Sequence, residues 1–253
     1  MSKVRVAFFD FACCEGCQLN VLNCEDKLLD ILNNIEIVNF REAMSEASDN
    51  YDIAFIEGSI TRECDIPRLK KIRENAKILI TLGSCSSIGG VNAIKNNFDL
   101  EDVRNEVYGN QKDYFETTLA RPIDAVVKVD YKIYGCPIHR EEFVRIITSL
   151  LAGQQPYIPN HPVCVECKLK DNFCVFDKGM TCLGPLTRAG CGARCPSEGN
   201  YCVGCRGMVD EPEVNAHFDI LKKYNLSIDD IKNKFEIYYS YYRKKFENIY
   251  NAR

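Results

Sequence analysis

The sequence has no long hydrophobic run and no marked excess of charge of one sign. A transmembrane helix needs about 18 or more consecutive apolar residues, and none of the 253 residues belongs to such a stretch. The first ten residues, MSKVRVAFFD, carry no long apolar core, no twin arginine and no small-residue cleavage motif, so we expect no export signal. A formal net charge of −4 disfavours broad attraction to nucleic acids or anionic membranes. We therefore predict a soluble, cytoplasmic protein without a membrane span or nucleic-acid partner.

The sequence also lacks the usual motifs of nucleotide binding and nucleophilic catalysis. The segment GSCSSIGG at residues 83–90 contains glycines, but it has neither a P-loop lysine nor a full G-x-G-x-x-G. No Ser-His-Asp or Cys-His arrangement stands out. We interpret His139, beside Arg140, as part of a solvated turn, and we leave His161 without a role. The sequence therefore predicts no catalytic residue in this chain.

Cysteine, in contrast, is abundant: the chain has 15 of them. Disulfide frameworks are typical of short exported proteins with an even number of cysteines. Here the chain is long, the number is odd and no export signal is expected. Clustered cysteines in a reducing compartment more often bind metal or carry out redox chemistry. Cys13, Cys24 and Cys64 are outside the clusters described below, and we interpret them as structural thiols.

The first 150 residues alternate between strand-like and helix-like segments. Apolar runs such as VRVAFF (residues 4–9) are typical of strands that are covered on both faces. This alternation predicts an α/β fold with a flavodoxin-like, doubly wound parallel sheet in a domain spanning residues 1–153. The expected strands are residues 4–9, 35–40, 52–57 and 77–82, with a fifth within 125–135, and the expected helices are residues 18–33, 66–75 and 140–153.

The second half of the chain has a different character. Residues 153–162, GQQPYIPNHP, have the composition of a linker. Residues 163–206 contain eight cysteines and little periodicity, so we expect an inorganic group to organise an irregular segment that has no adequate apolar core of its own. Two helices are expected after it, at residues 211–224 and 227–250. We therefore predict a second domain, residues 154–253, which is rich in cysteine and ends in helices.

Four cysteines follow three of the expected strands. Cys14 and Cys17 form the motif CEGC after the first strand, Cys85 follows the strand at 77–82, and Cys136 follows the fifth. The carboxyl ends of parallel strands share one edge of the sheet, so the fold brings these thiols together. Four thiolates are the number that a 4Fe–4S cluster requires. Taken singly, Cys85 or Cys136 would more often be a small buried residue, but four converging by topology favour a cluster.

The choice between Cys13 and Cys14 rests on spacing. Cys14 and Cys17 have the C-x-x-C spacing whose side chains can share one metal centre, whereas Cys13 and Cys17 are separated by three residues. We therefore choose Cys14 as the ligand and leave Cys13 as the alternative.

Two further sets of four cysteines lie in the second half. Two complete sets favour two more iron–sulfur clusters. Zinc is the serious alternative, because paired C-x-x-C motifs also form tetrahedral zinc sites. Zinc would make this part an interaction module without a redox role, and it would not explain the first set. The two sets are Cys164, Cys167, Cys174 and Cys182, and Cys191, Cys195, Cys202 and Cys205.

These motifs together resemble one known family. CEGC, EGS at residues 57–59, GSC, GCP and the eight-cysteine segment look like the small subunit of nickel–iron hydrogenases. More narrowly, CLGPLTRAGCGARCP followed by CVGCRG resembles the cytoplasmic NAD(P)-linked hydrogenases, including the archaeal sulfhydrogenases. The resemblance implies a flavodoxin-like domain with a proximal cluster and a cysteine-rich domain with a medial and a distal cluster.

The resemblance also implies a role for each cysteine set and for one carboxylate. Glu57 of the EGS motif matches a family position near the proximal cluster, so it is a candidate for a proton path or for support of the ligands. The implied ligands are Cys14, Cys17, Cys85 and Cys136 for the proximal 4Fe–4S cluster, Cys191, Cys195, Cys202 and Cys205 for the medial one, and Cys164, Cys167, Cys174 and Cys182 for the distal one.

The expected function is electron transfer within a nickel–iron hydrogenase. This chain has no nickel ligands beyond the cluster cysteines, so hydrogen would react at a nickel–iron site in a large-subunit partner. Three 4Fe–4S clusters would connect that site to a flavin-containing NAD(P) reductase, a ferredoxin-like subunit, or both. Three alternatives stay open: a small subunit that feeds a heterodisulfide reductase, the zinc-stabilised interaction module, and a subunit related to the quinone-reducing respiratory complex I, against which the second domain argues.

Overall fold

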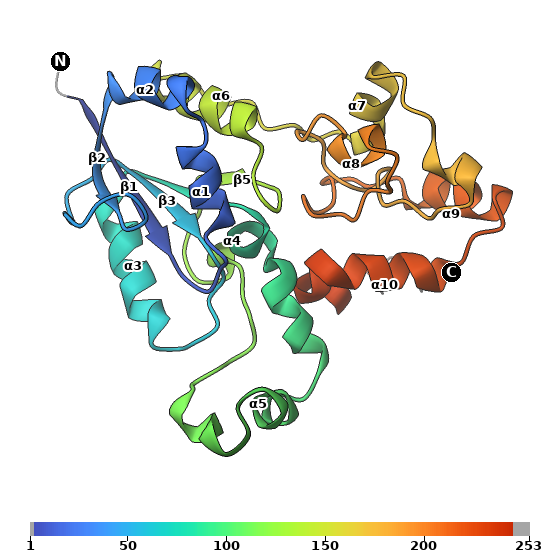
Figure 1. Cartoon of the computed structure of the whole chain (residues 1–253), viewed down its shortest axis with the longest axis horizontal. Coiled ribbons are helices and arrows are strands. Elements are labelled where there is room, and N and C mark those ends of the chain that lie inside the picture. Colours follow the sequence, from blue (N-terminus) through green and yellow to red (C-terminus); the bar gives the residue numbers. More distant parts are fainter. Residues whose placement is uncertain (1–2, 245–253) are drawn as a thin grey trace.

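A single five-stranded parallel sheet forms the centre of the N-terminal half (Figure 1). The computed structural model describes residues 3–244. The strand order β2-β1-β3-β4-β5 is that of a flavodoxin-like doubly wound sheet, so the predicted fold class is confirmed. The strands are β1 (Val4–Asp10), β2 (Ile35–Phe40), β3 (Ile53–Glu57), β4 (Ile78–Leu82) and β5 (Tyr131–Ile133).

Both faces of the sheet are buried, which explains the continuous apolar runs. Along β1, Val6 and Phe8 pack on one face and Ala7 and Phe9 on the other. Because neighbouring strands are parallel and in register, aromatic rings gather on the first face, where the ring centroids of Phe8 and Phe55 are 4.9 Å apart. The first face is covered by α1 (Gly16–Leu22), α2 (Asp26–Leu32) and α6 (Arg140–Leu151), and the second by α3 (Asp65–Asn75).

The single helix expected at residues 18–33 is wrong, because two helices occupy this segment. α1 ends at Leu22 and α2 begins at Asp26. Between them Glu25 has φ 52° and ψ −123°, which no helix can contain. The side chain of Arg140 donates a hydrogen bond to the carbonyl of Asn23. A residue far along the chain therefore stabilises the turn between the two helices.

The segment between β4 and β5 contains helices that the sequence analysis did not predict. Most are short, and only η1 and α5 are eight residues or longer. The segment leaves the sheet and returns to it, as Figure 1 shows in green. It comprises α4 (Ser84–Ile88), η1 (Gly90–Asn97), α5 (Leu100–Tyr108), η2 (Gly109–Tyr114) and η3 (Ile123–Ala125).

The cysteine-rich segment is mostly irregular, as expected, but it shares an apolar core with the C-terminal helices. Leu183 and Leu186 pack with Phe218, Leu221 and other residues of these helices in one buried cluster. The expectation that this segment lacks an adequate core therefore holds only for the segment taken alone. The elements here are α7 (Val163–Leu169), η4 (Val175–Lys178), α8 (Arg194–Ser197), α9 (Val214–Lys223), α10 (Ile228–Tyr239) and η5 (Ser240–Tyr242).

The last helix connects the two halves of the chain. The Ser227 hydroxyl caps α10 by accepting the N–H of Asp229. At its other end, Asn97 of η1 donates to the hydroxyl of Ser240 at 2.9 Å. A 3-10 turn interrupts the helix expected at 227–250 after Tyr239, and residues 245–250 of that prediction lie outside the described residues. None of the helices described between residues 3 and 244 is long and apolar enough to span a membrane.

Candidate metal centres

The first cysteine group lies at the carboxyl edge of the sheet. Cys14 and Cys17 follow β1, Cys85 lies in α4 directly after β4, and Cys136 follows β5. The pKa of the Cys85 thiol is raised to about 12, first by burial and then by the charges of Cys136 and Cys14. Burial also raises the pKa of Cys17, with smaller contributions from Glu57 and Cys85. The four predicted thiols therefore lie within reach of one another's charge.

Two glycines provide the space that the cysteine side chains of this group occupy. A Cβ on Gly83 would lie 2.3 Å from Sγ of Cys17, and a Cβ on Gly90 would lie 3.0 Å from Sγ of Cys85. Both residues also have positive φ angles, 93° and 53°, which side chains disfavour. Glycine is required at both positions if the thiols are to keep these places.

Glu57 lies beside this group and holds the backbone of α1. It is the last residue of β3 and is only 2% exposed. Its carboxylate accepts the backbone N–H of Cys17 at 3.1 Å and that of Gln18 at 3.0 Å. Burial raises the pKa of Glu57, and these hydrogen bonds offset part of the shift. Of the two roles considered for Glu57, this geometry favours support of the ligands.

The second group comprises the cysteines of α7 and the loop after it. Cys164 and Cys167 lie one helical turn apart, and Cys174 and Cys182 follow. The pKa of Cys164 is raised to about 12, chiefly by burial and then by the charges of the other three thiols. A Cβ on Gly184 would lie 3.3 Å from Sγ of Cys182 and 3.4 Å from Sγ of Cys164. This group, too, is gathered around a glycine.

The third group comprises the last four cysteines. The pKa of Cys205 is raised to about 12, mainly by burial and further by the charges of Cys191 and Cys195. Burial also raises the pKa of Cys202, and the charges of Cys182, in the second group, and of Cys205 add to this effect. Cys191, Cys195 and Cys202 thus lie near Cys205, and the division of the eight cysteines into two sets of four stays a prediction from spacing.

Hydrogen bonds connect the third group to each of the others. The backbone N–H of Cys136 in the first group lies near the Cys205 thiol and lowers the Cys205 pKa, which burial raises. The hydroxyl of Ser84 in α4 donates to the Cys205 carbonyl. On the other side, the N–H of Cys202 donates to Sγ of Cys182 in the second group at 3.2 Å. The third group thus contacts both of the others.

The donor sets fit iron–sulfur clusters. Each group offers four thiols, the usual ligand set of a 4Fe–4S cluster. Backbone N–H groups point at ligand sulfur, as the contacts of Gly184 (3.4 Å) and Cys202 (3.2 Å) with Cys182 show, and such bonds tune bound clusters. Across the described residues 3–244, no three His, Cys, Asp or Glu side chains lie close enough together to hold a single metal ion.

The three remaining cysteines differ in their surroundings. All 15 cysteines are free thiols. Cys24 is buried in the core under the first face of the sheet, whereas Cys64 is exposed at the start of α3. The pKa of Cys13 is raised to about 12 by burial and then by Glu57. A structural role in packing is therefore supported for Cys24 and not for Cys64.

The two histidines considered from sequence have minor roles in the structure. The ring of His139 pairs with Glu141 at 3.1 Å at the start of α6, which fits the predicted turn. His161 accepts the N–H of Ala189 through its backbone carbonyl at 2.8 Å.

Sequence reasoning missed two aromatic residues that contact the groups. Tyr238 of α10 lies beside the Cys136 thiol and lowers its pKa, which burial raises. His217 of α9 is buried, its Nε2 lies 3.1 Å from the Cys182 carbonyl oxygen, and burial lowers its pKa to about 4. Both lie in the C-terminal helices, beyond the cysteine motifs, so no local pattern connects them to the thiols.

Comparison with known families decides what these groups belong to. The family model described as NADH ubiquinone oxidoreductase, 20 Kd subunit, matches residues 14–150, which contain the whole first group. The chain belongs to this family. Sulfhydrogenase 2 subunit delta of Pyrococcus furiosus is 36% identical over 222 residues, which are 87% of this chain and 93% of that protein.

Two further relatives point to the same kind of protein. A subunit of the F420-non-reducing hydrogenase vhu of Methanocaldococcus jannaschii is 34% identical over 239 residues, covering 82% of this chain and 83% of that protein. A chain of a solved NAD+-reducing nickel–iron hydrogenase is 26% identical, with a TM-score of 0.56 over 62% of this chain and 96% of that one. The resemblance to hydrogenase small subunits is confirmed, and the chain belongs to the family of these hydrogenase subunits. Because the hydrogenase relatives extend well past residue 150, they disfavour the complex I alternative.

Proposed function

We propose that this small subunit holds three 4Fe–4S clusters and relays electrons between a nickel–iron site in a large subunit and a flavin-containing or iron–sulfur acceptor. The observation that carries the proposal is the pair of hydrogen bonds made by the third cysteine group. The Cys205 carbonyl accepts the hydroxyl of Ser84, which directly precedes Cys85 of the first group, and the N–H of Cys202 donates to Sγ of Cys182 in the second. They support an order in which the first group is proximal, the third medial and the second distal.

Bound clusters would act as one-electron carriers in this order, from the first group through the third to the second. The chain's own residues would do the rest. Thiols from separate segments converge, Cys17, Cys182 and Cys202 are buried away from water, and backbone N–H groups point at sulfur. Full cysteine ligation and the modest number of such contacts favour low potentials, which suit reversible exchange of electrons with hydrogen and nicotinamide.

Metal analysis of the purified complex tests the number and kind of cofactors. We expect about 12 iron atoms and a matching amount of sulfide in this chain, four for each of three clusters. A colourless protein that contains zinc in the second and third groups would support the interaction module and contradict the relay. Iron at about four atoms per chain would limit the chain to a single cluster.

Co-purification followed by mass spectrometry tests the partners. The proposal expects a large subunit with the nickel–iron site, together with a flavin-containing NAD(P) reductase or a ferredoxin-like subunit. A heterodisulfide reductase in the same complex would favour the alternative acceptor without changing the role of this chain. Fractionation of cells would test the expected cytoplasmic location.

Exposed apolar side chains beside the second group suggest where the acceptor binds. Leu169 and Phe173 are 80% and 87% exposed, and Phe173 directly precedes Cys174. α7, which ends at Leu169, lies at the end of the molecule away from the sheet (Figure 1). Large exposed apolar side chains next to a proposed distal cluster are suited to a protein interface.

We expect Phe173→Asp to lower hydrogen-driven reduction of the natural acceptor about tenfold, because aromatic anchors often contribute more than about 1 kcal/mol to an interface. Reduction of a small dye by the same complex should be unchanged, since a dye needs no protein interface. Leu29→Asp is a matched control, because Leu29 is 62% exposed on α2 beside the sheet. Equal losses with acceptor and dye in the Phe173 variant would contradict this docking site.

A further inference from the structure

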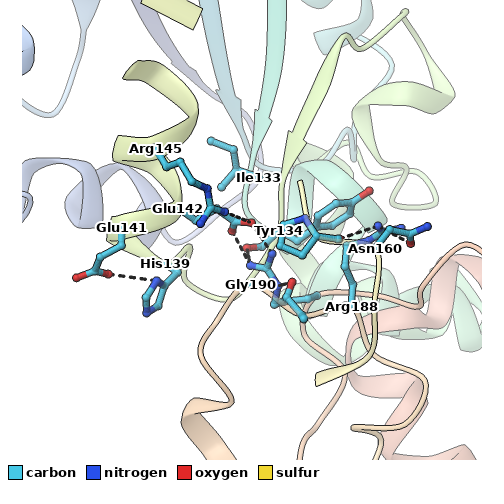
Figure 2. Close-up of polar contacts among 12 residues, drawn as sticks. Ile133, Tyr134, His139, Glu141, Glu142, Arg145, Asn160, Arg188 and Gly190 are labelled. Carbon is cyan, nitrogen blue, oxygen red and sulfur yellow. Dashed lines mark hydrogen bonds and ion pairs between the residues drawn. The ribbon is translucent and has the colours of Figure 1, made fainter. Parts of the chain in front are cut away.

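The buried ion pair of Arg206 and Glu142 lies where the first and third cysteine groups meet. Both side chains are 1% exposed. The guanidinium donates two hydrogen bonds to the Glu142 carboxylate, at 2.8 and 2.7 Å. It also donates to the Ala189 carbonyl at 2.8 Å and to the Tyr134 carbonyl at 2.6 Å. Figure 2 shows Glu142, Tyr134 and Gly190 converging between α6 and the cysteine-rich segment.

Each backbone contact of Arg206 is close to a proposed ligand. Tyr134 is two residues before Cys136, and Ala189 is two residues before Cys191. Arg206 itself directly follows Cys205. One guanidinium therefore ties together three loops that carry ligands of two different groups.

The surrounding backbone is shaped to fit this pair. A Cβ on Gly190 would lie 2.3 Å from Nη2 of Arg206 and 2.8 Å from Oε1 of Glu142, and Gly190 has φ 116°. Arg145 is the other cation near the pair, with Nη2 3.9 Å from Glu142 Oε1, but its side chain is 47% exposed and therefore screened. Arginine stays protonated in proteins, so the charge of Arg206 is permanent and Glu142 is its buried counter-charge.

Stability alone is a weak explanation for a buried pair of this kind. Apolar residues of similar volume often replace buried ion pairs without loss, whereas removing one partner leaves an uncompensated charge. Next to a redox centre that charge has a second effect. A positive charge stabilises the more negative, reduced state and raises the potential, and a negative charge lowers it.

We propose that Arg206 and Glu142 are a positioning pair that holds the ligand loops of the first and third groups and keeps the charge beside the third group balanced, thereby setting its reduction potential. The inference rests on the proposed function, because it requires an iron–sulfur cluster in the third group. Neither residue binds iron in this account. Both act through the loops and through their charges.

The test is an EPR-monitored redox titration of the purified hydrogenase complex. The signal that disappears in Cys195→Ala belongs to the third group. We expect Glu142→Gln to raise the potential of that signal and Arg206→Met to lower it. Each change should be about tenfold in the ratio of reduced to oxidised cluster at a fixed potential, which is 59 mV for one electron.

Two further variants separate charge from structure. The double variant Glu142→Gln with Arg206→Met removes both charges, so its potential should return close to that of the unmodified complex. Arg206→Lys keeps the charge but cannot form the same fork of hydrogen bonds, so its potential should stay while its unfolding temperature falls. Arg145→Gln should change neither property appreciably, since Arg145 is half-exposed.

The sign of the shifts decides the outcome. Shifts of the same sign in Glu142→Gln and Arg206→Met, or no shift in complexes with full iron, would overturn the inference. If Arg206→Met does not assemble, Glu142→Gln, which keeps the shape of the side chain, and Arg206→Lys still provide the test. An unmodified complex without any iron–sulfur signal would contradict the proposed function itself, which is a different result.

Discussion

With the three proposed clusters, replacement of Cys14 by alanine should leave the chain with about eight of roughly 12 iron atoms and should stop hydrogen-driven reduction of the acceptor. The charge of Cys14 acts on both Cys85 and Cys136, so its thiol belongs to the first group. Alanine offers no metal ligand. Loss of residues that merely support a ligand already costs about 10- to 100-fold in affinity or activity, and loss of the ligand itself should cost at least that. Iron per chain and the rate of acceptor reduction measure the effect.

Cys13→Ala is the matched control, because it removes a thiol from the neighbouring position. Burial and the charge of Glu57 raise the pKa of Cys13, and no other cysteine contributes to this shift. This variant should keep its full iron content and most of its activity. The reverse result, with iron lost from Cys13→Ala and retained in Cys14→Ala, would make Cys13 the ligand and would show that C-x-x-C spacing was a poor guide here.

The convergence of the first group could be predicted because it depends on topology alone. Apolar runs identified β1, β3 and β4 to within a residue or two, and the alternation with helices implied parallel strands. In such a sheet, residues that follow different strands meet at one edge. The distance along the chain between Cys17 and Cys136 was therefore no obstacle.

The residues that hold the groups in place could not be predicted in the same way. Glu142 and Arg206 are 64 residues apart, and neither lies in a pattern that signals a buried ion pair. Alone, Glu142 looks like an ordinary acidic residue in the first turn of α6. The break between α1 and α2 likewise depends on Arg140, which contacts Asn23 only in the folded chain.

The apolar core of the second half could not be predicted from the sequence either. The cysteine-rich segment has no periodicity, and its apolar residues look isolated. In the structure they meet Phe218 and Leu221 of α9 and Ile231 and Phe235 of α10. The C-terminal helices are amphipathic in sequence, but amphipathicity says that a face is buried and not what covers it.

Replacement of Gly83 by alanine will lower stability and disrupt the first group, because two independent effects coincide there. Gly83 has φ 93° and ψ 174°, a region that is almost limited to glycine and costs of the order of 1–3 kcal/mol for other residues. In addition, the new Cβ would lie 2.3 Å from Sγ of Cys17. A thiol that is bound to iron cannot move aside, so we expect a lower unfolding temperature and a loss of about four iron atoms.

Gly179→Ala separates the two effects, since Gly179 also has a positive φ, 72°, but nothing lies within 4 Å of a Cβ there. Its backbone strain alone should cost about 1–2 kcal/mol and leave the iron content unchanged. Thermal unfolding and iron analysis of the two variants, side by side, measure strain and steric contact separately. If Gly83→Ala behaved like Gly179→Ala, with full iron and a similar loss of stability, the close approach of Cys17 to the β4–α4 turn would not be required for assembly of the first group. The role assigned to this edge of the sheet would then rest on the thiols alone.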